Sequence, residues 1–194
     1  MIAIIDYGAG NVASVANAVT RLGCPFKITS DINDLTNAEK IIFPGVGEAS
    51  FAVKRLQESG LILFLQQTKK PMLGICLGMQ LMCIHSEEGN VDGLNIFPVN
   101  VVRFNSSDTK VPHIGWNTVQ YNPKNKLFSG IKQDEFFYFA NSYYVPLDNS
   151  TTSITENKIT FSASLAKDNF FGVQFHPEKS SEAGLKVLQN FIDY

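Results

Sequence analysis

Short apolar runs alternate with segments of helical periodicity over residues 1–85, and this alternation leaves few possible folds. The helical segments cover residues 12–22 and about 49–58, where apolar residues recur every three or four positions. Asn11 and Gly23 flank the first of these as residue types typical of an N-cap and a C-terminal stop. Unbroken apolar runs are typical of strands that are covered on both faces. The expected strands are Ile2–Tyr7, Phe26–Thr29, Lys40–Phe43 and Met72–Ile75.

After residue 85 the pattern becomes rich in β-forming residues, with polar loops between the segments. We expect a final helix at Ser180–Ile192 and no linker long enough to divide the chain, so that residues 1–194 form one domain. Together the two halves predict an α/β fold: an open, mostly parallel, doubly wound sheet with antiparallel strands added at one edge. The β-rich segments are Val99–Phe104, Gly115–Tyr121, Phe136–Ala140, Ile159–Leu165 and Phe170–Phe175.

Composition excludes several classes of function. The net charge is −2 and no basic run exceeds Lys69-Lys70, so neither nucleic acid nor a membrane is an expected partner. Asp6 interrupts the apolar N-terminus, which also lacks a basic leader, and we therefore expect a cytoplasmic protein. Three cysteines without paired spacing and three histidines without ligand spacing predict no disulfide framework, metal site or cofactor.

Cys76 follows one of the apolar runs and has a glycine two positions away on each side, Gly74 and Gly78. A cysteine on a sharp turn between a strand and a helix is held clear of the sheet, and the first N–H groups of the helix favour its thiolate. Cys76 is therefore a candidate nucleophile. The alternative is a cysteine that merely packs in the core, which is the interpretation that we prefer for Cys24 and Cys83.

His176-Pro177-Glu178 supplies an imidazole and a carboxylate at the end of another expected strand. Pro177 favours an extended conformation for His176, and in an extended segment side chains two positions apart point the same way. Glu178 can then orient the His176 ring and stabilise its charged form. The alternative is a solvated loop, but both this segment and Cys76 lie at carboxyl ends of strands, where open α/β sheets place their sites.

Pro44-Gly45-Val46-Gly47 ends a further expected strand. A nucleophile that attacks an amide needs N–H donors for the oxyanion, and Leu77 N–H and one N–H of this turn are candidates. The glycines also allow a peptide to flip, so that the donor set can form when it is required. A plain turn between a strand and a helix explains the same residues equally well.

The Pro-Gly-Val-Gly turn, Gly74–Gln80 and His176–Glu178, in this order, resemble the triad-type (class I) glutamine amidotransferases, whose fold is flavodoxin-like. Within that family, four further segments resemble the branch of glutaminase subunits that serve imidazole glycerol phosphate synthases in histidine biosynthesis. The resemblance extends from Ile4 to the final helix. The four segments are Ile4–Asn11, Pro112–Asn117, Ser142–Tyr144 and Gly172–Ser180.

The resemblance implies that glutamine is hydrolysed to glutamate and ammonia through a thioester on Cys76. His176 then transfers protons and Glu178 holds His176. It further implies an oxyanion hole formed by Leu77 and the turn Gly45, Val46 and Gly47. The residues that it implies for binding glutamine are Gln80, Ser142 and Tyr143.

The same resemblance implies a heterodimer, in which ammonia passes to a (β/α)8-barrel cyclase subunit. That subunit makes imidazole glycerol phosphate and an aminoimidazole carboxamide ribonucleotide. Asn11, Trp116 and Lys179 are similar to residues at this subunit interface. Asn141 is a departure, because family members commonly have histidine there. Three rival functions are an ammonia supplier for another synthase, such as one that modifies a surface sugar, a stand-alone cysteine hydrolase, and a non-catalytic scaffold. The intact Cys76, His176 and Glu178 argue against the scaffold.

Overall fold

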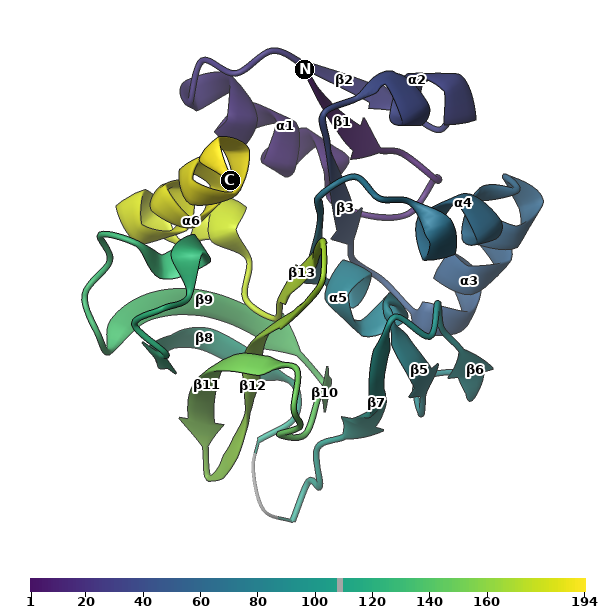
Figure 1. Ribbon diagram of the computed structural model, residues 1–194. Coiled ribbons are helices and arrows are strands. Elements are labelled where there is room, and N and C mark those ends of the chain that lie inside the picture. The colour runs from purple at the N-terminus through teal and green to yellow at the C-terminus, as the bar shows by residue number, and fades with distance from the viewer. Residues whose placement is uncertain (108–109) are drawn as a thin grey trace.

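The computed structural model of the protein describes residues 1–107 and 110–194. A nine-stranded sheet runs through the molecule in the order β2-β1-β3-β4-β13-β12-β11-β8-β9 (Figure 1). Strands β2 to β13 in this order are parallel, and the strands beyond β13 are antiparallel. The bounds are β1 Ile2–Ile5, β2 Phe26–Thr29, β3 Lys40–Gly45, β4 Met72–Cys76, β8 His113–Tyr121, β9 Glu135–Asn141, β11 Thr151–Asn157, β12 Ile159–Lys167 and β13 Phe170–Val173.

Helices cover both faces of the parallel half, as the sequence predicts for a doubly wound sheet (Figure 1). Successive residues of β1 enter different cores, since Ile4 packs in one hydrophobic cluster and Ile5 in the other. One face carries α1 and α6, and the other carries α3, α4 and α5. The helices are α1 Val12–Arg21, α2 Ile32–Asn37, α3 Ala49–Glu58, α4 Leu61–Gln67, α5 Leu77–Leu81 and α6 Ser181–Asp193, with short 3-10 turns η1 Lys126–Phe128 and η2 Pro177–Lys179.

The antiparallel half packs around buried aromatic rings. Phe137 and Phe175 lie 4.2 Å apart between ring centroids, and Phe128 and Phe139 contact Phe175 from the sides. These rings join β9 to the segment that follows β13. They therefore form part of the base on which the residues after β13 rest.

A second, four-stranded sheet was not expected from the sequence. It has the order β10-β7-β5-β6, with β5 Cys83–Ser86, β6 Val91–Asp92, β7 Phe97–Arg103 and β10 Tyr143–Tyr144. The expected strand Val99–Phe104 is present as β7, but the prediction that it adds to an edge of the main sheet is wrong. It pairs instead with β10 on one side and with β5 on the other.

Three other elements escaped the sequence reading: α2, α4 and β11. Helices α2 and α4 have six and seven residues, too few to display a clear periodicity. Strand β11 has many Thr and Ser residues, whose side chains bond across to β12 and so replace apolar packing. No helix in residues 1–107 or 110–194 is long and apolar enough to span a membrane.

Candidate active site

Cys76, His176 and Glu178 come together because β4 and β13 are adjacent parallel strands. Val173 pairs with Ile75, so the residues that follow each strand emerge side by side at the carboxyl edge of the sheet. His176 Nδ1 lies 2.9 Å from Glu178 Oε1, and both side chains are almost fully buried. The His176 ring also interacts with the Cys76 side chain. The three side chains thus form a continuous chain from carboxylate to imidazole to thiol.

The backbone at Cys76 is strained. Its φ of 53° and ψ of −112° lie where residues with a Cβ rarely occur, and β4 ends there as α5 begins. Glycines on both sides permit the close packing of α5 on the sheet. A Cβ at Gly74 would lie 2.6 Å from Met82 Sδ, and one at Gly78 would collide with the carbonyl oxygen of Phe43. The sharp turn therefore presents the thiol at the edge of the sheet, as expected for a nucleophile.

His176 is held in its charged form. Burial by itself lowers the pKa of the imidazole, but the hydrogen bonds and charges of Cys76 and Glu178 outweigh burial and raise this pKa from 6.5 to about 10. The main chain is anchored as well, since His176 N donates to Tyr138 O at 2.8 Å and Ser180 Oγ donates to His176 O at 2.6 Å. A protonated, immobile imidazole beside the Cys76 sulfur is suited to deliver a proton to a leaving amine.

Cys76 and His176 line a cavity of about 270 Å³, large enough for an amino acid. Most of the residues that the sequence suggested for the site also line it: Val46, Gly47, Leu77, Gln80, Ser142, Tyr143 and Lys179. Gly45 and Glu178 do not line the cavity themselves but contact residues that do. Gly45 pairs with Cys76 in the sheet, and Glu178 contacts the far side of the His176 ring.

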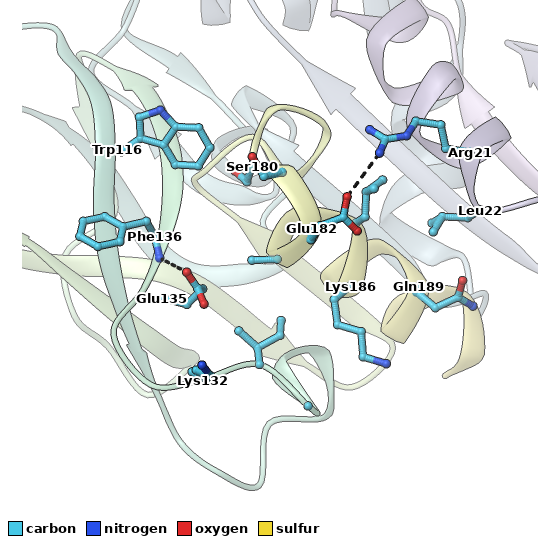
Figure 2. Close-up of a pocket in the computed structure, with 15 residues that line it drawn as sticks. Arg21, Leu22, Trp116, Lys132, Glu135, Phe136, Ser180, Glu182, Lys186 and Gln189 are labelled. Carbon is cyan, nitrogen blue, oxygen red and sulfur yellow. Dashed lines mark hydrogen bonds and ion pairs between the residues drawn. The ribbon is translucent and has the colours of Figure 1, made fainter.

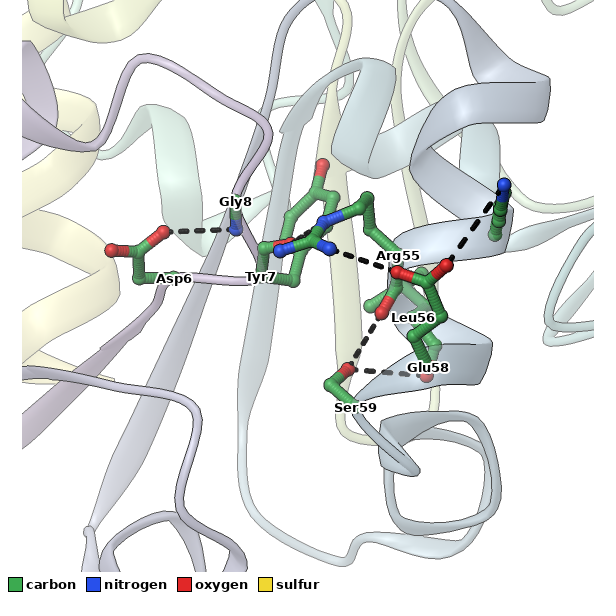
Figure 3. Close-up of polar contacts among 8 residues, drawn as sticks. Asp6, Tyr7, Gly8, Arg55, Leu56, Glu58 and Ser59 are labelled. Carbon is green, nitrogen blue, oxygen red and sulfur yellow. Dashed lines mark hydrogen bonds and ion pairs between the residues drawn. The ribbon is translucent and has the colours of Figure 1, made fainter.

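The loop after β1 stabilises the Pro-Gly-Val-Gly turn through a hydrogen bond. Tyr7 is buried, and its hydroxyl donates to Pro44 O at 3.2 Å. Arg55 of α3 reaches to Tyr7 O and also pairs with Glu58 at 2.8 Å (Figure 3). Burial raises the pKa of Tyr7, and the neighbouring Cys76 adds to this effect, so the phenol stays a neutral hydrogen-bond donor.

Gln80 is buried rather than exposed. Its Nε2 donates to Tyr143 O at 3.0 Å and to Gln174 Oε1 at 2.9 Å. Tyr143 belongs to β10, which pairs with β7, and so the second sheet carries one wall of the cavity. Asn141 Nδ2 donates to the same carbonyl at 2.9 Å. The segment 141–143 is thus fixed against the helix that follows the nucleophile.

Sequence reasoning missed two side chains of the site, Glu88 and Gln174. Glu88 follows β5. Among the described residues that line the cavity, it is the one that has a carboxylate. It also accepts from Ala49 N at 3.0 Å. Partial burial, with Glu48 nearby, raises its pKa. No local pattern marks Glu88, whereas Gln174 lies two positions before His176, and the same extended-segment rule would have found it.

The residues proposed for an interface come from three places in the fold, the start of α1, β8 and η2. Asn11 caps α1 by accepting from Ser14 N at 3.3 Å. Lys179 lines the cavity, and its Nζ lies 5.9 Å from the Tyr138 ring, which packs edge-on against the half-exposed Trp116. Trp116 borders a larger hollow of about 830 Å³ between β9 and the ends of α1 and α6, which is separate from the triad (Figure 2).

Known proteins resemble this chain over its full length. The family model of class-I glutamine amidotransferases matches residues 3–194. The imidazole glycerol phosphate synthase subunit HisH of Bacteroides fragilis (strain YCH46) is 52% identical over 194 residues, covering 99% of this chain and 98% of that protein. Subunit HisH 2 of Methanococcus maripaludis is 44% identical over 199 residues, with coverages of 99% and 98%.

Solved structures agree on the fold. The crystal structure of a glutamine amidotransferase superposes with a TM-score of 0.78 at 14% identity, covering 100% of this chain and 98% of the other. A glutamine amidotransferase from Thermotoga maritima superposes with a TM-score of 0.65 at 16% identity, covering 99% and 82%. By its matching family model and its close relatives, the chain belongs to the class-I glutamine amidotransferase family.

Proposed function

We propose that this protein hydrolyses L-glutamine to glutamate and ammonia as the glutaminase subunit of an imidazole glycerol phosphate synthase. The observation that carries the proposal is the contact chain Glu178–His176–Cys76 at the wall of a cavity of amino-acid size. Relatives about half identical to this chain over its whole length, each named as a HisH subunit of that synthase, support the assignment to histidine biosynthesis.

The reaction proceeds in two halves. Cys76 Sγ attacks the side-chain carbonyl carbon of glutamine, and His176 gives its proton to the nitrogen as the C–N bond breaks and ammonia leaves. Water then gives a proton to His176 and attacks the thioester, and the C–S bond breaks to release glutamate and the thiolate. The N–H of Leu77 and one from Gly45, Val46 or Gly47 stabilise the oxyanion in both halves.

Other residues of the cavity wall are suited to the amino-acid end of glutamine. Glu88 offers a carboxylate for the α-ammonium group, and Ser142 and Tyr143 offer polar groups. Gln80 also lines the cavity, one helical turn beyond Cys76. Binding of the α-ammonium group explains why the cavity needs an acidic group that is not part of the triad.

Ammonia passes to a partner, which we propose is a (β/α)8-barrel cyclase subunit in a heterodimer. Lys179, Tyr138 and Trp116 form a row of contacts from the cavity to the surface, which supports transfer on that side. Asn11, at the start of α1, is assigned to the same interface. Asn141, which stands where relatives of this kind commonly have histidine, keeps open a paralogous role with another synthase.

One assay separates these functions. Glutamate release is measured with the chain alone, with the cyclase, and with the cyclase and its nucleotide substrate. We expect slow turnover alone and strong stimulation in the complete mixture. Rapid hydrolysis independent of a partner supports the stand-alone hydrolase, and turnover that the cyclase does not stimulate supports a paralogous supplier.

Replacement of the nucleophile tests the division of labour. Cys76→Ala should abolish synthesis driven by glutamine, because no thioester can form, while synthesis from added ammonium salt continues at the rate of the normal complex. Cys24→Ala is the control, since this cysteine lies outside the cavity and should leave both rates unchanged. Loss of the ammonia-driven reaction in Cys76→Ala would contradict the proposed transfer of ammonia between subunits.

A further inference from the structure

We propose that Gln174 is a second hydrogen-bond donor to the sulfur of Cys76 and favours its thiolate, which presupposes, as in the proposed function, that Cys76 is the nucleophile. Gln174 Nε2 lies 3.7 Å from Cys76 Sγ, a hydrogen-bond distance for sulfur. His176 also interacts with this sulfur, and the Cys76 thiol lies 4.0 Å from Ala140 O, to which it can donate. Two side chains of different kinds thus approach the nucleophile, a titrating imidazole and a non-titrating amide.

The sheet register brings Gln174 to this position. Val173 of β13 pairs with Ile75 of β4, and the residues that come next in the chain are Gln174 and Cys76. The main chain of Gln174 is fixed on its other side, where its N–H donates to Ala163 O at 2.9 Å. His176 lies two positions further along and faces the same way. Both side chains thus approach the sulfur from one backbone segment.

A backbone carbonyl determines which end of the Gln174 amide faces the sulfur. Tyr143 O can only accept, and Gln80 Nε2 donates to it at 3.0 Å. The same Gln80 nitrogen is 2.9 Å from Gln174 Oε1, which must then be the acceptor of that bond. The remaining end of Gln174, the NH₂ group, is left to face Cys76 Sγ. The two amides form a relay that leads from β10 to the nucleophile.

Burial makes this donor important. Gln174 is 0% exposed and Gln80 and Cys76 are 5% and 7% exposed, so water can solvate the sulfur only from the cavity side. A buried anion without donors is strongly disfavoured, and a hydrogen bond to the charged form favours that form. Gln174 supplies such a bond and cannot lose its proton, unlike His176.

The amide acts at two moments of the reaction. Before attack it stabilises the thiolate beside protonated His176. During collapse of the thioester intermediate, negative charge returns to the sulfur as the C–S bond breaks, and the amide donates to it again. At that stage His176 holds the proton that it took from the attacking water. Gln174, whose amide always has its N–H groups, shares with His176 the stabilisation of the negative sulfur.

The test is the rate at which iodoacetamide alkylates Cys76 as a function of pH, with the modified cysteine identified by peptide mapping. Gln174→Met keeps the length of the side chain and removes the donor. We expect about tenfold slower alkylation at pH 7 and a midpoint about one pH unit higher, as for the loss of one bond to a charged group. Gln174→Glu can still accept from Gln80 but presents an oxygen to the sulfur. The alkylation rate of Cys76 should therefore fall further in this variant than in Gln174→Met.

The control is Gln66→Met, the same replacement at a glutamine of α4 whose amide donates to Leu94 O away from the site. It should leave the alkylation profile unchanged. Thermal unfolding of each variant separates reactivity from stability. A Gln174→Met variant that unfolds like its parent and keeps the parent's pH profile overturns the proposal.

Failure of the proposed function gives a different result. In that case Cys76 of the unchanged protein is not alkylated faster than Cys24, and glutamine does not protect it. If the unchanged protein reacts rapidly at Cys76 and glutamine protects it, but Gln174→Met and Gln174→Glu react equally fast, only the role of Gln174 is wrong.

Discussion

The protonation of His176 depends on its two partners more than on its burial. Burial lowers its pKa, whereas Cys76 and Glu178 raise it to about 10. A raised pKa means that the ring keeps its proton as the pH rises through neutrality. Removal of one partner must therefore move the loss of this proton to lower pH, because part of the stabilisation of the charged ring disappears.

Glu178→Gln tests this directly. The amide still accepts from His176 Nδ1 but has no charge, so the pKa of His176 should fall. We expect the alkaline limb of the pH profile of kcat/KM for glutamine to move down by about one unit, and the maximum to fall about 100-fold or more. Glu182→Gln, at an exposed carboxylate on α6, is the matched control. An alkaline limb that stays in place in Glu178→Gln would show that the carboxylate does not control this proton.

The turn from β4 into α5 is the element that makes Cys76 accessible. The turn requires α5 to pack directly on β3 and β4, which leaves no room for a side chain at Gly78. The strained conformation of Cys76 persists only while this packing holds it. Stability and reactivity are thus coupled at the turn.

Gly78→Ala should therefore lower both the stability of the protein and the reactivity of Cys76. The added methyl group meets the backbone of β3, which cannot move aside, and should lower the free energy of unfolding by about 1–3 kcal/mol. It should also displace α5 and slow the alkylation of Cys76. Gly23→Ala is the comparison: no atom lies within 4 Å of its added Cβ, and its φ of 67° costs about 1 kcal/mol. Normal Cys76 reactivity in Gly78→Ala would argue against this coupling. Urea unfolding and alkylation kinetics measure the two effects.

The arrangement of the two sheets bears on where the proposed partner subunit receives ammonia. The cavity lies between the carboxyl edge of the parallel strands and the second sheet, and the row Lys179, Tyr138 and Trp116 leads from it across β8 and β9. Trp116 is 51% exposed although its ring packs against Tyr138. A large half-exposed aromatic ring beside a hollow is typical of the energetic centre of an interface.

Trp116→Ala should weaken binding of the proposed cyclase subunit about 30-fold, the effect of about 2 kcal/mol that buried interface tryptophans commonly contribute. Glutamine hydrolysis by the isolated chain should not change. Phe51→Ala is the matched control, because Phe51 is 52% exposed on α3, far from β8 and β9 (Figure 1). Titration calorimetry measures both. Equal affinities for the two variants would remove Trp116 from the proposed interface.

Much of the parallel half and of the triad could be predicted from the sequence. Apolar runs, helical spacing and the glycines around Cys76 are local signals, and parallel pairing places the ends of β4 and β13 at one edge. The second sheet could not be predicted, because β10 lies far along the chain from β7 and none of its strands shows where it pairs. Glu88 was missed for the same reason, since β5 brings it to the cavity.

Local patterns thus determine the class of fold, the candidate nucleophile and its proposed acid–base pair, since each depends on the preferences of a few neighbouring residues. Contacts between distant segments decide the rest: the wall at Tyr143, the acid Glu88, and the amide relay through Gln80 and Gln174. The physical reason is that hydrogen-bond direction and burial arise only when strands pair and exclude water. A glutamine beside a buried sulfur is chemically significant because of what surrounds it, and tertiary structure alone supplies those surroundings.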